Sequence, residues 1–286
     1  MLYVIASLLP FLGYGIFDFA SSKLSKERDP SAISLVFSLT HFFVALSIAL
    51  VFGLPEVTLV GLGKFFLAGL TVSSGFLILI HAFKLGAAGI VAPIANSYAI
   101  ITLLISVAFL SEQPSILQIT GTAVVVGGII VLSRSIDPVS KKSDKNNAAI
   151  LAVIAMILFG LGFALFDYAA DQAWYQNVVL FELAGTVISF LMFLFFVRKN
   201  RLRSVVELAR SRYLLIGTIG GVLGNIGVFV SLERLGSVSV PAAIGSASPL
   251  VTAYLAFVVD KERLSLIKRI ASIVVIVGVA MITLAV

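Results

Sequence analysis

Long uninterrupted apolar runs recur along the whole chain and restrict what it can fold into. A helix that crosses the bilayer core needs roughly 20 mostly apolar residues, because each residue adds only about 1.5 Å of length. Runs of about that length occur at residues 2–22, 31–54, 62–83, 88–110, 116–133, 148–169, 177–198, 212–233, 238–259 and 265–286. A membrane β-barrel would instead show short segments of alternating hydrophobicity. We therefore predict an all-α membrane protein with ten transmembrane helices.

The composition excludes a soluble domain and several kinds of chemistry. Hydrophobic residues make up 60% of the chain and charged residues 12%, whereas soluble domains have about 45–50% and about 25%. The chain has no cysteine, which removes disulfides and thiolate sites, and its two histidines, His41 and His81, are far apart in sequence. We expect no metal and no cofactor.

The basic residues favour one side of the membrane. With ten spans, 18 of the 20 Lys and Arg residues fall in odd-numbered loops, and only Lys64 and Arg234 fall on the other side. The positive-inside rule then makes the odd loops cytoplasmic and places both termini outside. This distribution explains the net charge of +6 without a nucleic-acid partner. The expected surroundings are the lipid bilayer of a plasma membrane, with the chain acting as a monomer.

The first run, 2–22, is read as a retained span and not as a signal peptide. A signal peptide carries positive charge before its apolar core. Here the charges follow the core, at Lys23, Lys26 and Arg28.

The two parts of the chain repeat each other. At an offset of 149, Phe17-Asp18-Phe19-Ala20 matches Phe166-Asp167-Tyr168-Ala169, and at an offset of 150 Glu112 matches Glu262. We predict one five-helix repeat over 1–133, a cytoplasmic linker over 134–147 and a second repeat over 148–286. Because five is odd, the second repeat would enter the membrane from the opposite side. Inverted repeats of this kind are typical of secondary transporters.

Several motifs carry a resemblance to a known family. Ala82-Phe83-Lys84-Leu85-Gly86 leads through one apolar run to Glu112, and Glu233-Arg234-Leu235-Gly236 leads through Pro249 to Glu262. In this pattern, and in the glycines of the following runs, the whole chain resembles the EamA-type ten-helix exporters of the drug/metabolite transporter superfamily. It departs from the family where Ala99 stands at the position that would repeat Pro249. The resemblance implies a central cavity lined mainly by spans one to four and six to nine.

Ionisable residues inside apolar runs are candidates for function, because burying them in a membrane is costly. Asp18 and Asp167 lie near opposite ends of their spans, and the repeat maps one onto the other. Tyr14 lies one turn before Asp18. The carboxylates could attract a cationic substrate or exchange protons at the two mouths of a cavity, or they could be hydrated groups near helix ends.

Two further titratable residues lie within spans. Glu182 is five residues into its run, on the side that lacks basic residues, where it could couple transport to protons or instead point outward to the interface. His41 could titrate or bind substrate, or it could be a packed neutral side chain.

The remaining candidates are neutral. Asn96 and Tyr98 lie in the fourth run and Asn225 in the eighth, where their side chains could hydrogen-bond a substrate. Prolines remove a backbone hydrogen bond and kink helices, so we name three hinge candidates: Pro93, Pro241 and Pro249.

These features favour a secondary transporter of small metabolites, an exporter of amino acids or related amines working by alternating access, with coupling to protons as one option. A facilitator or exchanger of neutral solutes such as sugars is the alternative within transport. An intramembrane enzyme is the alternative of another class, but the chain has no H-E-x-x-H or G-x-S-x-G motif. No phosphate-binding loop of the form G-x-x-x-x-G-K-[ST] is present either, which disfavours direct use of ATP.

Overall fold

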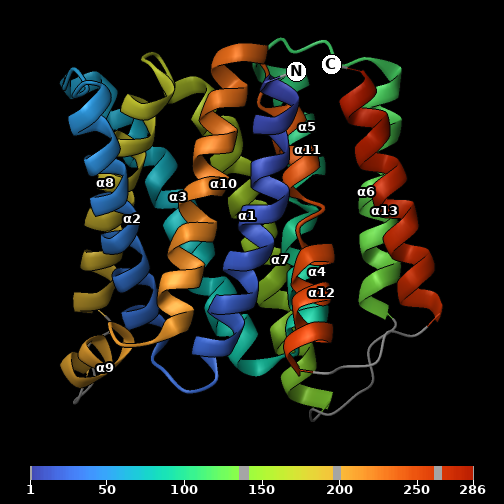
Figure 1. Ribbon diagram of the computed structural model, residues 1–286, viewed down its shortest axis with the longest axis horizontal. Helices are drawn as coiled ribbons and strands as arrows, with labels where there is room; N and C mark the ends of the chain where they lie inside the picture. The colour runs from blue at the N-terminus through green and yellow to red at the C-terminus, as the bar shows by residue number, and fades with distance from the viewer. Residues whose placement is uncertain (1, 135–141, 196–200, 261–265, 286) are drawn as a thin grey trace.

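The computed structural model describes residues 2–134, 142–195, 201–260 and 266–285. All regular structure in these ranges is helical, which confirms the predicted all-α class. The elements are α1 (Leu2–Ser25), α2 (Pro30–Phe52), α3 (Leu59–Leu85), α4 (Ala88–Ala95), η1 (Asn96–Tyr98), α5 (Ala99–Phe109), α6 (Ile116–Arg134), α7 (Lys142–Ala169), α8 (Trp174–Phe195), α9 (Arg201–Leu208), α10 (Arg212–Leu235), α11 (Ser239–Gly245), α12 (Pro249–Asp260) and α13 (Leu266–Leu284). The helices stand side by side, and both chain ends lie at the same end of the bundle (Figure 1).

Seven helical segments of the described residues are long and apolar enough to cross a membrane. They are Pro30–Phe52, Leu59–Leu85, Ala88–Phe109, Asn146–Ala169, Trp174–Phe195, Arg212–Leu235 and Ser239–Val259. Two further apolar helices, Ile116–Val131 and Arg269–Leu284, are shorter. The chain is therefore a multi-pass membrane protein, and the number of ten spans stays a prediction.

Local sequence signals explain where individual helices begin and end. The Asp29 carboxylate accepts hydrogen bonds from the backbone N–H groups of Ser31 at 3.0 Å and Ala32 at 3.3 Å, which caps the start of α2. Pro30 follows as the first helical residue, where a missing N–H costs nothing. Gly236 ends α10 with φ +62°, a left-handed conformation that glycine adopts without strain.

Two of the expected spans are broken in the middle. η1 separates α4 from α5, and a turn at residues 246–248 separates α11 from α12. Pro93 and Pro241 lie inside the first half-helix of each pair, and Pro249 begins α12. Near these prolines the α-helix is therefore interrupted, by one turn of 3-10 helix in the first span and by a turn in the second. The two breaks occupy matching positions of the sequence repeat.

The packing of the helices also repeats. α1 packs along α10 and α3 along α7, and the sequence repeat maps the first pair onto the second. α2 packs on α8 and α6 on α13, which joins equivalent helices of the two halves. The pair α6 and α13 lies at one edge of the bundle (Figure 1). These contacts give the chain its two-repeat architecture.

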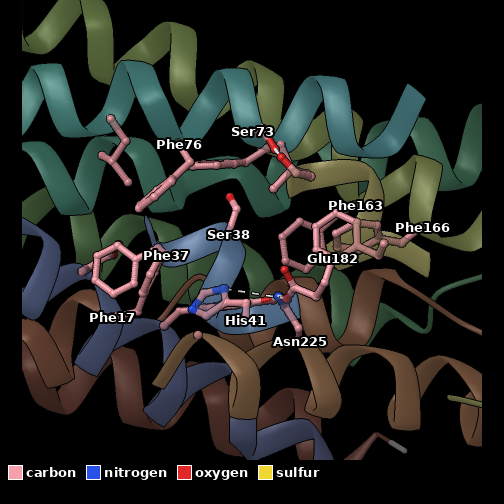
Figure 2. A pocket seen from close by; sticks show the side chains of 18 of the residues that line it. Phe17, Phe37, Ser38, His41, Ser73, Phe76, Phe163, Phe166, Glu182 and Asn225 are labelled. Carbon is pink, nitrogen blue, oxygen red and sulfur yellow. Dashed lines mark hydrogen bonds and ion pairs between the residues drawn. The ribbon is translucent and has the colours of Figure 1, made fainter. Parts of the chain in front are cut away.

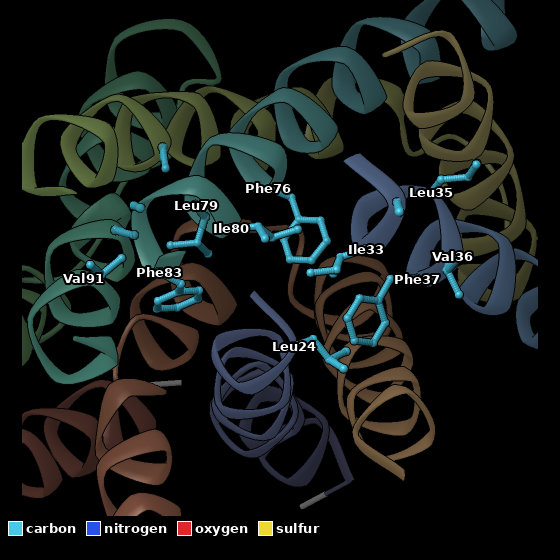
Figure 3. Close-up of a cluster of buried hydrophobic side chains, with 14 of the residues drawn as sticks. Leu24, Ile33, Leu35, Val36, Phe37, Phe76, Leu79, Ile80, Phe83 and Val91 are labelled. Carbon is cyan, nitrogen blue, oxygen red and sulfur yellow. The ribbon is translucent and has the colours of Figure 1, made fainter. Parts of the chain in front are cut away.

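Buried apolar side chains join the helices around a common interior. One cluster draws Leu24 from α1, Ile33 and Phe37 from α2, and Phe76 and Phe83 from α3 (Figure 3). Phe37 and Phe76 also line a cavity, so this core holds part of the cavity wall in place.

The short helix α9 and the region between the halves were harder to read from sequence. α9 is amphipathic and buries Leu208 completely, while its Glu207 pairs with Arg28. It lies within a stretch that the hydropathy pattern assigns to a polar loop. Half of the expected linker, 134–147, lies outside the described residues, and α7 begins at Lys142, within that expected linker.

Candidate functional site

A cavity of about 100 Å³ lies between the two halves of the bundle. Six helices and η1 contribute its lining, which comprises Tyr14, Phe17, Asp18, Phe37, Ser38, His41, Val72, Ser73, Phe76, Leu79, Asn96, Tyr98, Phe159, Phe163, Phe166, Phe181, Glu182, Gly185, Gly221 and Asn225.

Glu182 is the centre of one polar network. Its side chain, on α8, is buried, and its Oε1 accepts a 2.6 Å hydrogen bond from Asn225 Nδ2 on α10. The Tyr14 hydroxyl on α1 donates to Asn225 Oδ1 at 2.9 Å. His41 Nδ1 lies 3.7 Å from the same Glu182 oxygen, which is beyond hydrogen-bond distance (Figure 2). The network therefore joins residues of both halves.

Asp18 is the centre of a second network. Its Oδ2 accepts a 2.7 Å hydrogen bond from Asn96 Nδ2, and that amide also donates to the Ala92 carbonyl at 3.0 Å. The Ser248 hydroxyl, in the break between α11 and α12, donates to Asn96 Oδ1 at 3.1 Å. The broken helices thus meet at their breaks, beside a buried carboxylate. Broken helices that meet within the membrane commonly surround transport sites.

Aromatic rings form most of the remaining wall. Phe17 stacks on Phe76 with ring centres 4.7 Å apart and contacts Phe37 edge-on at 4.9 Å. A second group begins with Tyr98 stacked on Phe163 at 4.6 Å. It continues through Phe166 and Phe181. Figure 2 shows Phe17, Phe37 and Phe76 on one side of the His41–Glu182–Asn225 group and Phe163 and Phe166 on the other.

Glycines of α10 make room for the polar rings. A Cβ on Gly224 would lie 2.4 Å from the Tyr14 ring, and one on Gly221 would lie 2.4 Å from the His41 ring. The two side chains can therefore lie directly against the α10 backbone. From the sequence these glycines indicate only a helix contact.

The structure brings most of the predicted site residues together. Seven of them line the cavity: Tyr14, Asp18, His41, Asn96, Tyr98, Glu182 and Asn225. Asp167 is not in the lining. It is half-buried and lies near Glu112, so the cavity pairs Asp18 with Glu182 and not with the residue that the repeat assigns to it.

Some cavity residues escaped the sequence analysis. Ser38 and Ser73 are ordinary in membrane helices, and the phenylalanines are indistinguishable from lipid-facing residues by type. For Phe17 and Phe166 the sequence offers one indication of a cavity position, since both belong to the repeated tetrapeptide. No group of three His, Asp or Glu side chains in the described ranges could hold a metal ion.

Glu112 has a different role from the cavity carboxylates. Its carboxylate accepts hydrogen bonds from the Ser237 hydroxyl at 2.9 Å and the Val238 N–H at 2.8 Å, and also bonds Ser239. These groups lie at the start of α11, so Glu112 caps a helix of the other half. Its repeat counterpart, Glu262, lies outside the described residues.

Comparison with known proteins finds matches among protein families and among solved structures. A family model described as the EamA-like transporter family matches residues 1–134 and 146–284. A solved structure described only as "Crystal structure of protein" superposes with a TM-score of 0.73 at 17% identity, covering 98% of this chain and 99% of its own. At that identity the likeness shows the fold alone. A search of curated proteins finds no match.

Proposed function

The chain belongs to the EamA-like transporter family, and on that premise we propose that it is a secondary transporter which exports small metabolites such as amino acids or related amines. Family membership supports a membrane transporter of small solutes. The two matched segments cover the two halves of the chain, in keeping with alternating access by rocking one half against the other.

One observation carries this proposal: two buried carboxylates, Asp18 and Glu182, line one cavity between the halves. Each is hydrogen-bonded to an asparagine, and each of the two networks includes residues of both halves. A rocking motion would change both networks, so binding at either carboxylate can bias the position of the halves.

The proposed topology has ten spans as two inverted repeats in the plasma membrane, with both termini outside. Contacts between loops support it, because within the described ranges they join loops that this topology places on the same side of the membrane. Lys26 Nζ donates to the Phe83 and Gly86 carbonyls on the expected cytoplasmic side. Lys64 Nζ lies 3.9 Å from Asp171 Oδ2, and both residues lie on the expected outer side.

Proton coupling is part of the proposal. A carboxylate removed from water can take up and release a proton when the access of water changes. We expect purified protein in liposomes to take up a labelled amine faster when a pH gradient is imposed than without one. Protein-free vesicles with the same gradient set the background.

The variants Asp18→Asn and Glu182→Gln, which cannot carry the charge, should lose the gradient dependence. Asp171→Asn serves as the control, because Asp171 is half-exposed and outside the cavity. Normal transport by Asp18→Asn, Glu182→Gln and Asp167→Asn at every pH would contradict a coupling role for these acids.

A further inference from the structure

The cavity has acidic side chains but no basic ones, so it lacks a cation that could pair with the carboxylate of an amino acid. Its lining contains two carboxylates, one histidine and two tyrosines, but neither lysine nor arginine. The lysines and arginines of the surrounding helices lie near helix ends, as Lys23 and Lys84 do. A free carboxylate entering the cavity would therefore face two acids without an obligate cation to pair with it.

Glu182 has the geometry to receive a cation. Its Oε1 accepts the Asn225 hydrogen bond, and its Oε2 has no hydrogen-bond donor among the residues that the structure describes. The whole residue is only 4% exposed. A buried carboxylate oxygen gains most from a positively charged donor, since charge-assisted hydrogen bonds are the strong ones.

One further polar group nearby also lacks a partner. The Tyr98 hydroxyl is buried without a hydrogen-bond partner, and Tyr98 lines the cavity. A polar atom left unpaired in a buried site carries an energetic cost that a bound molecule can relieve. The Tyr98 hydroxyl is therefore a second indication that a polar ligand belongs here.

The walls suit the body of such a ligand. Phe17 and Phe76 lie on one side of the polar centre, and Phe163 and Phe166 lie on the other (Figure 2). Aromatic faces attract ammonium groups as well as flat apolar bodies. Ring walls around an unpaired carboxylate match an amine that carries an aromatic or similarly apolar group.

We propose that the substrate is an organic cation with an aromatic or apolar body and no carboxylate, whose ammonium group binds Glu182 while its body packs between the two aromatic groups. This inference rests on the proposed function, and it restricts the substrates named there, amino acids or related amines, to amines. Asp18 is the second carboxylate that lines the same cavity.

Three compounds with the same phenyl ring test the preference for charge. They are 2-phenylethylamine, a cation at neutral pH; phenylalanine, a zwitterion; and 3-phenylpropionate, an anion. Binding to the full chain in detergent is measured by isothermal titration calorimetry. We expect the amine to bind at least about tenfold more tightly than phenylalanine and the anion not to bind, because a ligand carboxylate would face two acids in the cavity without a lysine or arginine to pair with it. Methylamine should bind more weakly than the ring-bearing amine.

Variants then locate the ammonium group. Glu182→Gln should weaken 2-phenylethylamine binding by about tenfold or more, and Glu182→Asp, which keeps the charge, should retain part of it. Asp171→Asn should bind normally. The comparison of compounds on the unchanged chain tests the charge preference even where a variant fails to fold.

The proposal is overturned where phenylalanine or 3-phenylpropionate binds as tightly as the amine, where the amine does not bind, or where folded Glu182→Gln keeps its affinity. Transport is measured separately, in liposomes. An amine that binds through Glu182 without being transported would contradict the proposed function alone, and transported amino acids with weak amine binding would contradict this inference alone.

Discussion

Asn96 holds together parts of the chain that are far apart in sequence. Its amide nitrogen donates to Asp18 and to the Ala92 carbonyl, and its amide oxygen accepts from Ser248. Asp18 receives no other hydrogen bond that the structure describes for its carboxylate. Losing Asn96 would therefore leave a buried carboxylate without its donor, which is more costly than losing an ordinary hydrogen bond.

Replacing Asn96 by leucine, which has a similar volume, should lower stability by about 1–3 kcal/mol, because Asp18 and Ser248 both lose their partner. The melting temperature of purified protein in detergent measures the effect. Ser97→Ala is the matched control, since the Ser97 hydroxyl bonds only the Pro93 carbonyl of its own helix. Equal melting temperatures for the two variants would show that the network does not support Asp18.

At the residue scale, the sequence identifies candidate cavity residues better than it identifies which of them lie together. Asp18 and Glu182 stand out because each is an acid within an apolar run, and both line the cavity. The repeat correctly relates the positions of Asp18 and Asp167 along the chain. It cannot show which faces of two helices enclose the same space, and Asp167 lies outside that space.

Among the elements, the contact between α1 and α10 depends on glycine. A Cβ added to Gly13 would lie 2.4 Å from the Gly220 carbonyl oxygen and 2.6 Å from the Gly224 nitrogen. Both neighbours are backbone atoms, so neither can rotate away. α1 carries Tyr14 and Asp18 and α10 carries Asn225, so the spacing of the two helices sets the geometry of both polar networks.

Gly13→Ala should therefore destabilise the protein, by about 1–3 kcal/mol as overpacking does, and should weaken amine binding as well. Gly63→Ala is the matched control, because a Cβ there meets nothing within 4 Å. Without a clash, alanine in a helix is favoured over glycine by about 0.5–1 kcal/mol, so the control should be unchanged or more stable. Melting temperatures in detergent measure the change in stability of each variant. A Gly13→Ala variant that is more stable than the original chain would contradict the close contact between α1 and α10.

The helix breaks show what a hydropathy pattern misses. An apolar run of the right length predicts a span, and α2, α3 and α8 follow their runs closely. Near Asn96 and Ser248 the α-helix is interrupted although the apolar run continues, and backbone hydrogen bonds of the tighter i→i+3 kind, such as that from Ser248 N–H to the Gly245 carbonyl, replace those of the α-helix. The hydropathy pattern also misses α9, because this helix is too short and too polar to form an apolar run and buries only one face.

On the scale of the whole molecule, the two halves meet around the cavity and share its polar groups. Asp18, Tyr14 and His41 come from the first half, and Glu182 and Asn225 from the second. In alternating access the cavity faces each side of the membrane in turn, so a given cavity residue should be reachable from both sides at different times. A fixed pore or a closed binding pocket would not behave in this way.

The absence of cysteine makes this testable with single introduced thiols. Ser38 lines the cavity and Ser47 lies on the exposed face of the same helix, where lipid would cover it. Ser38→Cys should react with a membrane-impermeant maleimide added to either side of oriented vesicles, and 2-phenylethylamine should slow the reaction, because the ligand occupies the same space. Ser47→Cys should stay unlabelled from both sides, since the reagent does not enter lipid. Reaction of Ser38→Cys from one side only, with or without ligand, would rule out alternating access through this cavity.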